Sequence, residues 1–258
     1  GMNIANLLPI AADEKVTSMI RVPEFDEEKY LVMVTKQGII KRISLNAYNT
    51  ARKGGLIALE LNDGDELAWV RLTDGNQQVI VATKNGLAIR FEETDVRPMG
   101  RQARGVKAIS LREGDCVVGM CVVTNDDLIL TASETGFGRI SNVSDYRLQS
   151  RGGKGITNYH TEKYGNVAAV SAVKLDEDII IISQEGVIIR IAADTVRICN
   201  RPSKGVTLMR IGENDKVVTV ARAPHEDSES EKTEETAEEE TSEENTAPET
   251  NAEENTEE

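Results

Sequence analysis

The sequence predicts an all-β fold, a propeller-like array of four-stranded blades with about 50 residues per repeat, followed by a disordered acidic C-terminal tail. Three observations lead to this prediction. Glycines recur 50 residues apart, short β-branched runs flank polar–glycine turns, and the last 34 residues contain no aliphatic or aromatic run. A period near 50 is typical of propeller repeats, whereas Val/Ile alternation with a glycine in every hairpin disfavours a helical solenoid.

Four hairpins give the strongest repeat signal. In each, short β-branched runs flank a two-residue polar–glycine turn, and alternation of apolar and polar residues resumes beyond it. The four segments read LVMVTKQGIIKRI, VIVATKNGLAIRF, LILTASETGFGRI and IIIISQEGVIIRI. A base follows each turn glycine by three or four residues, namely Arg42, Arg90, Arg139 and Arg190. We expect these bases to reach the outer edge of the fold; the alternative is that they pair with carboxylates in the turns.

A second series consists of basic loops around glycines spaced 50 residues apart: Gly55, Gly105, Gly155 and Gly205. Bases stand one and four residues before three of these glycines, as Arg101 and Arg104, Arg151 and Lys154, and Arg201 and Lys204. In the first repeat the register slips to Arg52 and Lys53. A further turn, written NDGDEL, REGDCV or GENDKV, follows three of the loops, so one repeat holds about four short strands.

The repeats define the domain organisation. Four complete repeats span 30–77, 78–127, 128–177 and 178–223. Residues 1–29 align with the second half of a repeat, which favours a portion of the protein upstream of this sequence over a half-blade that closes a ring. We therefore expect one folded domain at 1–224 and a tail at 225–258.

The charge is divided unevenly between these two parts. The chain has 44 acidic and 30 basic residues, a formal net charge of −14. Of these, 16 acids and one base lie in 225–258, so residues 1–224 carry 28 acids and 29 bases. The tail cannot bury enough apolar surface to fold. We predict that it competes with a polyanionic partner for the basic loops; the alternative is a passive, solubilising tail.

Residue types for catalysis or metal binding are scarce. Histidine occurs only as His160 and His225, and Cys116, Cys121 and Cys199 have neither an even number nor a metal-ligand spacing. Small buried thiols in a reducing compartment fit best. No stretch reaches 18 apolar residues, and the N-terminus has no signal pattern. The sequence therefore predicts no enzyme activity for this part alone, no cofactor and no membrane partner.

Each basic loop combines cations with exposed backbone. Arg and Lys bind phosphodiesters together with backbone N–H groups, and glycine lets the backbone approach closely with φ above zero. In LQSRGGKGI, we expect the amides of Gly152 and Gly153 to form a concave anion site with Arg151 and Lys154 on its rim. A phosphodiester polyanion is the predicted partner, contacted through its phosphates rather than through base edges.

The segment QSRGGKG at 149–155 resembles the gyrase box, Gln-(Arg/Lys)-Arg-Gly-Gly-(Arg/Lys)-Gly, of the C-terminal domains of the DNA gyrase A protein. The likeness extends through NLLPI at 6–10, DGDELAWVRL at 63–72, VRPMG at 96–100 and the four hairpins. Members of that family are β-pinwheels that wrap DNA around a basic perimeter. The resemblance implies a cytoplasmic, nucleoid-associated bacterial protein that works with the rest of gyrase A and with the gyrase B protein to introduce negative supercoils.

The resemblance and the loops together define the predicted DNA-contacting residues. In the loops they are Arg52, Lys53, Arg101, Arg104, Gln149, Arg151, Gly152, Gly153, Lys154, Gly155, Arg201 and Lys204. In the hairpins they are Arg42, Arg90, Arg139 and Arg190.

Two departures from the family pattern leave alternatives open. Ser150 stands where the box has a base, and the family's principal box lies upstream of the NLLP segment, so the copy at 149–155 is either the main box or a relative of it. No tyrosine of this chain follows an arginine, as the DNA-cleaving tyrosine of the family does, so catalysis is not carried over. The alternatives are the equivalent domain of topoisomerase IV and a protein-binding propeller scaffold.

Overall fold

The computed structural model describes residues 14, 16–22, 24–50 and 55–225. It divides the chain into two units, Gly1–Ala223 and Pro224–Glu258. The predicted tail beyond His225, most of the predicted half-blade, and Arg52 and Lys53 lie outside the described residues.

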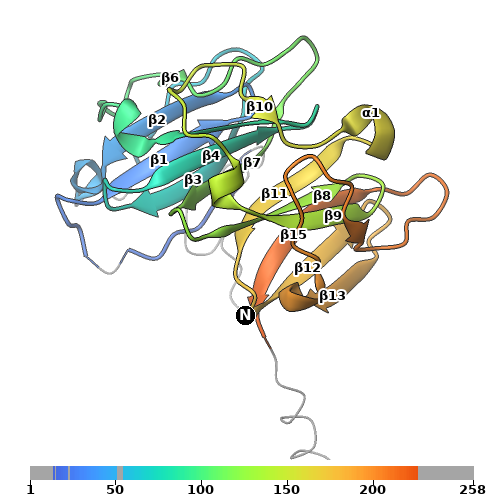
Figure 1. The fold of residues 1–258 in the computed structure, drawn as a ribbon. Helices are drawn as coiled ribbons and strands as arrows, with labels where there is room; N and C mark the ends of the chain where they lie inside the picture. The colour runs from blue at the N-terminus through green and yellow to red at the C-terminus, as the bar shows by residue number, and fades with distance from the viewer. Residues whose placement is uncertain (1–13, 15, 23, 51–54, 226–258) are drawn as a thin grey trace, which may run out of the picture. The chain divides into compact units, whose positions relative to one another are not determined.

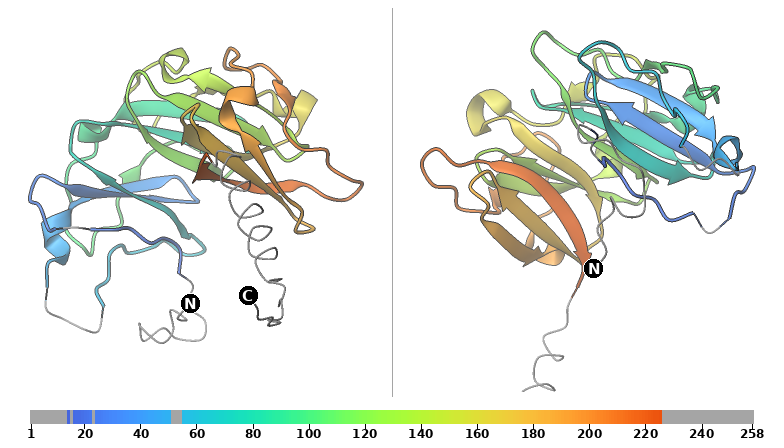
Figure 2. Two further views of the ribbon diagram at one scale, coloured as in Figure 1. Left: turned by 90° about the horizontal axis from the view of Figure 1, so that it is seen from below. Right: turned by 180° about the vertical axis from the view of Figure 1, so that it is seen from behind.

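Four antiparallel sheets follow one another along the chain, as the colour change from blue to orange shows in Figure 1 and, from two other sides, in Figure 2. In spatial order, sheet A consists of β3 (Leu67–Thr73), β1 (Tyr30–Thr35), β2 (Ile39–Ser44) and β6 (Val106–Lys107). Sheet B consists of β10 (Ile156–Thr157), β5 (Leu87–Glu92), β4 (Gln78–Thr83) and β7 (Val117–Val123). Sheet C consists of β11 (Val167–Val173), β8 (Leu128–Ser133), β9 (Phe137–Asn142) and β14 (Val206–Thr207). Sheet D consists of β13 (Ile188–Ala192), β12 (Glu177–Ser183) and β15 (Val217–Pro224). The predicted all-β, propeller-like fold is confirmed.

All four predicted hairpins form. Strand β1 pairs with β2, β4 with β5, β8 with β9 and β12 with β13. The turn glycines have φ between 80° and 85°, in the left-handed region that a residue with a Cβ rarely adopts. A hydroxyl at the end of the first strand also closes the turn: the Ile39 N–H donates to Thr35 Oγ1 at 3.1 Å, and equivalent bonds occur in the other hairpins.

The blades exchange strands, which the sequence did not predict. We expected each repeat to form its own four-stranded blade, but the third strand of a repeat pairs with the sheet of the repeat before it. Strand β6 extends sheet A beside β2, β10 extends sheet B beside β5, and β14 extends sheet C beside β9. Among the described residues no strand covers β13 in the same way, and Val187 and Ile188 beside this edge are 50% and 63% exposed.

This exchange explains the glycines spaced 50 residues apart. Gly105 precedes β6 with φ +95°, and a Cβ built on it would lie 2.6 Å from the Ile40 carbonyl oxygen of β2. Gly155 precedes β10 with φ +73°, and its Cβ would lie 2.5 Å from the Ala88 carbonyl oxygen of β5. These glycines therefore let one backbone cross another, as well as supplying the turn.

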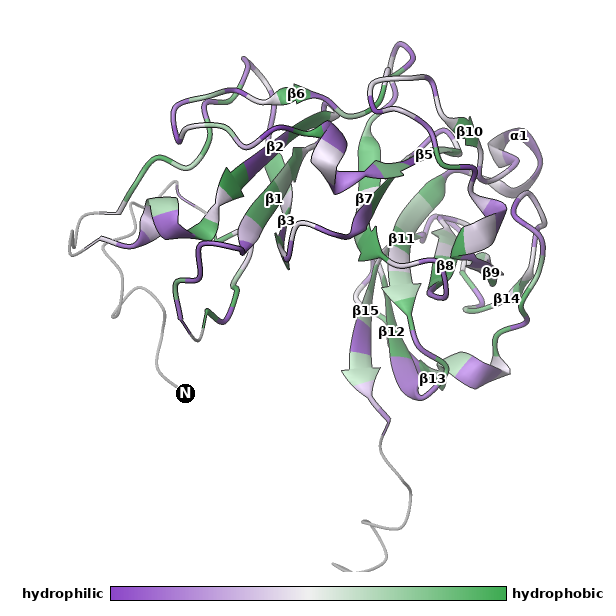
Figure 3. Ribbon diagram, turned by 60° about the vertical axis from the view of Figure 1, so that its left-hand side comes forward, coloured by the Kyte–Doolittle hydropathy of each residue, from purple (hydrophilic) through white to green (hydrophobic). Residues whose placement is uncertain are grey.

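The core is made of branched aliphatic residues that join neighbouring sheets, and the strands accordingly appear mostly green in Figure 3. One buried cluster combines Val32 and Ile40 of sheet A with Val79 and Phe91 of sheet B. A second joins sheets B and C, and a third joins sheets C and D. Burial of these faces supplies the main stabilisation, at roughly 25 cal/mol per Å² of apolar surface removed from water.

Short elements complete the repeats. A 3-10 turn follows the second strand of each hairpin, as η2 (Leu45–Tyr48), η3 (Glu93–Asp95), η4 (Val143–Asp145) and η5 (Ala193–Thr195). The third repeat adds the single-turn helix α1 (Thr161–Tyr164). In the described part of the chain, no helix is long and apolar enough to cross a bilayer.

Candidate nucleic-acid interface

The basic loops occupy equivalent positions in three successive repeats. They span 96–105, 146–155 and 196–205, and each runs from a 3-10 turn to the strand exchanged with the preceding sheet. Parallel bridges join each loop to that sheet: Pro98 to Arg42, Leu148 to Arg90, and Ile198 to Ile140. The loops therefore occupy equivalent positions on sheets A, B and C.

The arginine four residues before the last glycine of each loop donates to backbone carbonyl groups of the preceding repeat. Arg151 Nε lies 2.9 Å from the Asp95 oxygen, and its Nη1 lies 3.2 Å from the Lys107 oxygen. Arg201 Nε lies 3.0 Å from the Asp145 oxygen, and its Nη1 donates to the Thr157 oxygen. These side chains are thus tied to the protein on one side of the guanidinium group.

The base directly before the last glycine of each loop is exposed in all three repeats. Arg104 forms a surface ion pair with Glu60 at 2.6 Å, which raises the pKa of the arginine. Lys154 is exposed, and Lys204 Nζ lies 3.6 Å from the centre of the Phe137 ring. A lysine on an aromatic face keeps its charge and remains accessible to a phosphate.

The glycine pair of 149–155 has a different role from the one we expected. The Gly152 N–H donates to the Ala108 oxygen at 2.6 Å, and the Ser110 N–H donates to the Gly153 oxygen at 2.8 Å. Ser110 Oγ donates to the Gly152 oxygen at 2.8 Å. The expected anion site needs the Gly152 N–H to point towards solvent, and this N–H is already bonded inside the protein. The glycine pair therefore packs the loop against the preceding repeat.

The remaining box positions also join repeats. The Gln149 N–H donates to the Arg90 oxygen at 2.8 Å, and Gln149 Oε1 accepts from Arg147 Nη2 at 3.3 Å. Gly155 leads into β10 and lets the loop cross β5 closely. These positions hold the loop in place beneath its exposed cations.

Three of the four hairpin arginines are buried, so the expectation that they reach an outer edge is wrong for them. Arg42, Arg90 and Arg139 are 6%, 5% and 0% exposed. Arg42 Nε lies 3.5 Å from Glu93 Oε2, and Arg90 Nη1 donates to the Val143 oxygen at 2.9 Å. Burial lowers the pKa of Arg90 and of Arg139. The fourth, Arg190, is exposed and pairs at 2.6 Å with Asp178, a carboxylate of strand β12 rather than of a turn.

Arg139 also differs from Arg42 and Arg90 in register. The bridges align Arg42 and Arg90 with Ile140, so Arg139 occupies the position of Lys41 and its side chain lies on the opposite face. Lys41 Nζ donates to the oxygens of Ala58, Arg101 and Ala103 at 2.7, 2.5 and 3.1 Å. Arg139 likewise donates to the oxygens of Asn158 and Asn200 at 2.5 and 3.2 Å. Both buried cations fasten a basic loop to the sheet beneath it.

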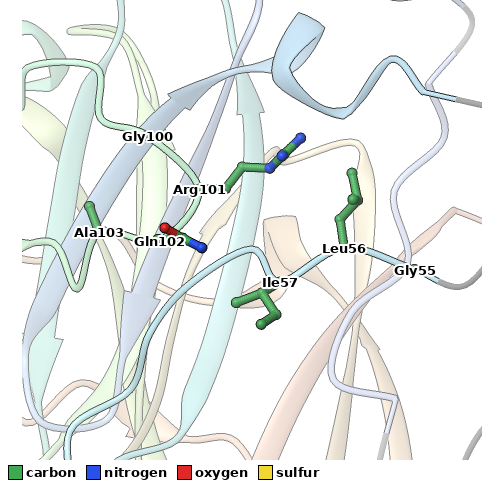
Figure 4. Close-up of a pocket in the computed structure, with 7 residues that line it drawn as sticks. All are labelled: Gly55, Leu56, Ile57, Gly100, Arg101, Gln102 and Ala103. Atoms are coloured by element: carbon green, nitrogen blue, oxygen red, sulfur yellow. The ribbon is translucent and has the colours of Figure 1, made fainter. Parts of the chain in front are cut away.

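A groove of about 560 Å³ lies beside the loop of the second repeat, lined by Gly55–Ile57 and Gly100–Ala103 (Figure 4). The Arg101 side chain extends along it, and its Nη1 donates to the Ala47 oxygen at 3.0 Å. Arg101 in this groove therefore donates to a backbone carbonyl of the preceding repeat, as Arg151 and Arg201 do.

Three exposed arginines were missed by the sequence reasoning. All three are exposed and stand 50 residues apart, two residues after the ends of η3, η4 and η5: they are Arg97, Arg147 and Arg197. Their spacing is visible in VRPMG, YRLQS and VRICN. The signal was the same 50-residue period, applied four residues upstream of Arg101, Arg151 and Arg201.

Comparisons with known proteins agree with this architecture. The family described as "DNA gyrase C-terminal domain, beta-propeller" matches residues 29–74, 77–123, 127–174 and 177–224. The DNA gyrase A protein of Clostridium acetobutylicum is 54% identical over 107 residues, which are 42% of this chain and 13% of that protein. The corresponding protein of Halalkalibacterium halodurans is 53% identical over 107 residues, with the same coverage of 42% and 13%. The chain thus matches only a small part of the length of these relatives.

Solved structures show the same fold. A C-terminal domain of DNA topoisomerase IV superposes with a TM-score of 0.82 at 27% identity, covering 93% of this chain and 75% of that one. A DNA gyrase A C-terminal domain superposes with a TM-score of 0.75 at 28% identity, covering 86% and 75%. Since the family match extends over most of the chain and follows its four repeats, the chain belongs to the DNA gyrase C-terminal domain family.

Proposed function

We propose that this chain binds duplex DNA through its phosphate backbone and bends the duplex along the edge that carries the basic loops. One observation carries the proposal: three successive repeats present exposed cations at equivalent positions. These are Arg97, Arg147 and Arg197, together with Arg104, Lys154 and Lys204. A row of cations with the period of the repeats suits a polyanion that passes one blade after another.

The recognition is independent of base sequence. Lys154 and its equivalents Arg104 and Lys204 are exposed bases on loops. Contacts from such bases to phosphates fix the position of a duplex but do not distinguish one base sequence from another. A path along several blades requires the duplex to bend, at a cost of roughly 1–6 kcal/mol for a site of 20–30 bp. Contacts with successive loops offset this cost.

Membership of the family supports a role for this chain within a larger enzyme. We propose that it is the DNA-wrapping part of the A protein of a bacterial, cytoplasmic DNA gyrase, acting with the rest of gyrase A and with the gyrase B protein in an A2B2 complex. In that complex the wrapped DNA crosses a second DNA segment with one handedness, and this crossing is the one used for strand passage. The gyrase B protein uses the ATP. The complete A2B2 complex, rather than this chain alone, introduces the negative supercoils.

Salt titration of DNA binding tests the phosphate contacts. Fluorescence anisotropy with two duplexes of unrelated sequence should give similar affinities for the full chain and a steep fall in affinity with salt. The variant Lys154→Gln should weaken binding to both duplexes and reduce the log–log salt slope by about 1. The exposed Lys174, which lies outside the basic loops, provides the control as Lys174→Gln. Loss of affinity for one sequence alone would contradict backbone recognition.

The equivalent domain of topoisomerase IV is the second candidate, favoured by the TM-score of 0.82 with such a domain. The two differ in what the complete enzyme does. The holoenzyme containing this chain should introduce negative supercoils into relaxed plasmid with ATP if the gyrase assignment is right. Relaxation and decatenation without net negative supercoiling would support the topoisomerase IV assignment.

A further inference from the structure

Arg151 and Arg201, four residues after the exposed Arg147 and Arg197, each donate to carbonyl oxygens of two elements that belong to neighbouring blades. Arg151 donates to Lys107 in β6, a strand of sheet A, and to Asp95 in η3, directly after β5 of sheet B. One guanidinium group therefore joins two neighbouring blades. It does so at the edge where the exchanged strands and the basic loops meet.

The same arrangement recurs one repeat later. Arg201 donates to Thr157 in β10, a strand of sheet B, and to Asp145 in η4, directly after β9 of sheet C. Its guanidinium carbon lies 5.8 Å from the centre of the buried Tyr146 ring. The donor atoms are the same in both repeats, and the acceptor residues lie 50 positions apart in the chain. This recurrence argues against an accidental surface contact.

We propose that Arg151 and Arg201 are positioning residues that fasten neighbouring blades together and thereby fix the spacing of the phosphate-binding cations from one blade to the next. The DNA part of this inference rests on the function proposed above. It replaces direct phosphate contact as the main role of these two residues, which the sequence had suggested. Arg101, whose side chain has one described hydrogen bond, to Ala47, is the weaker member of the series.

The chemistry requires arginine. Nε and Nη1 of Arg151 reach two carbonyl oxygens that belong to different elements, and the planar group holds both donors in a fixed relation. A lysine ammonium keeps the charge but donates from a single atom on a flexible stem. Arg→Lys therefore separates the two roles: it preserves a phosphate contact and removes the two-armed bridge.

The consequence for DNA follows from geometry. Lys154 lies three residues after Arg151 in the same loop, so a change in the angle between sheets A and B moves the loop cations relative to one another. A stiff, bent duplex tolerates little change in the spacing of its contacts. We expect loss of the bridge to reduce bending without removing a phosphate contact.

The experiment compares Arg151→Lys, Arg151→Gln and Lys154→Gln with the full wild-type chain. Energy transfer between the ends of a labelled duplex reports bending, anisotropy at several salt concentrations reports phosphate contacts, and hydrogen–deuterium exchange without DNA reports the bridge itself. Circular dichroism verifies folding, and Lys174→Gln is the control outside the loops. Arg201→Lys repeats the test at the second bridge.

Both Arg151 variants should lower the energy transfer of the saturated complex and keep the wild-type salt slope. In both, peptides containing η3 and β6 should exchange at least several-fold faster than in the wild type. Lys154→Gln should reduce the slope by about 1 without changing the exchange of the peptides that contain η3 and β6.

One result would contradict the proposal: Arg151→Lys retains wild-type bending and exchange, while Arg151→Gln reduces the log–log salt slope by about 1. That combination would identify Arg151 as a phosphate contact. If Arg151 variants do not fold, the exchange of η4 and β10 in Arg201→Lys decides. If the wild-type chain binds no DNA, the proposed function fails, and the exchange measurement still tests the bridge by itself.

Discussion

Burial separates the arginines of this chain into two chemical groups that have the same appearance in the sequence. Arg90 and Arg139 donate to carbonyl oxygens inside the protein, whereas Arg97 and Arg147 are exposed to solvent. Burying a guanidinium group is costly unless its donors are bonded. Turn and loop carbonyls accept from Arg90 Nη1 and from Nε and Nη2 of Arg139, although Arg139 Nη1 has no hydrogen-bond partner among the described residues. Single residues therefore contribute either to cohesion between blades or to the charged edge.

Glycine at the strand crossing gives a prediction at the same scale. Gly105→Ala combines a φ of +95° with a Cβ 2.6 Å from the Ile40 oxygen, so it should destabilise the fold by at least about 2 kcal/mol. Urea unfolding followed by circular dichroism measures the change. Gly114→Ala has φ +72° and open space within 4 Å, so it should lose only roughly 1–2 kcal/mol. Equal losses in the two variants would show that the crossing imposes no steric demand.

The buried thiol gives a second prediction. Burial raises the pKa of Cys121 to about 11 from 9.0, so the folded state binds the thiol proton more tightly than the unfolded state does. The resulting contribution to stability is present below pH 9 and is lost as the pH rises towards 11.

In a chain carrying only Cys121, a thiol reagent at pH 8 should therefore react no faster than the protein unfolds. A chain carrying only the half-buried Cys199 is the comparison and should react directly. Rapid labelling of Cys121 in the folded protein would contradict its burial.

At the scale of elements, polar groups buried between blades join the first two hairpins to the 3-10 turn of the following repeat. Glu93, 1% exposed in η3, accepts from Thr73 Oγ1 at 2.6 Å and from the Gln77 N–H at 2.8 Å. It also pairs with Arg42 of sheet A at 3.5 Å. One carboxylate thus links sheet B to sheet A and fixes the chain between β3 and β4.

Removal of that carboxylate should be costly. Glu93→Ala leaves the Arg42 guanidinium group buried without its counter-charge, so we expect a loss of about 3–5 kcal/mol in the free energy of unfolding. Glu60→Ala, which removes the exposed ion pair with Arg104, should change stability little because water screens that pair. Unfolding midpoints in urea compare the two. Similar midpoints for both variants would mean that the buried pair contributes no more than the surface pair.

At the scale of the whole molecule, the repeats link the packing between blades to the placement of the exposed cations. Each exchanged strand, such as β6 or β10, ties a repeat to the sheet before it, and the loop leading into that strand carries the exposed cations. The sheets and the row of loops therefore have the same period. A change in the contact between two blades is a change in the spacing of two cationic loops.

The sequence by itself determined the local structure. A hairpin turn depends on a few neighbouring residues, so the polar–glycine signals located all four hairpins, and the period of 50 located the basic loops. The family followed from the combination of these repeats with QSRGGKG, and the family match agrees.

Only the tertiary structure decided which repeat completes which blade, and on which side each cation lies. Strand exchange depends on contacts between residues far apart in the chain, such as Ile40 with Val106, which local propensity does not encode. A shift of one residue between Arg139 and Arg90 moves the side chain to the other face of a strand, and the hairpin pattern tolerates either position. For the same reason, the Gly152 N–H became an internal donor to Ala108, because its partner comes from the neighbouring repeat.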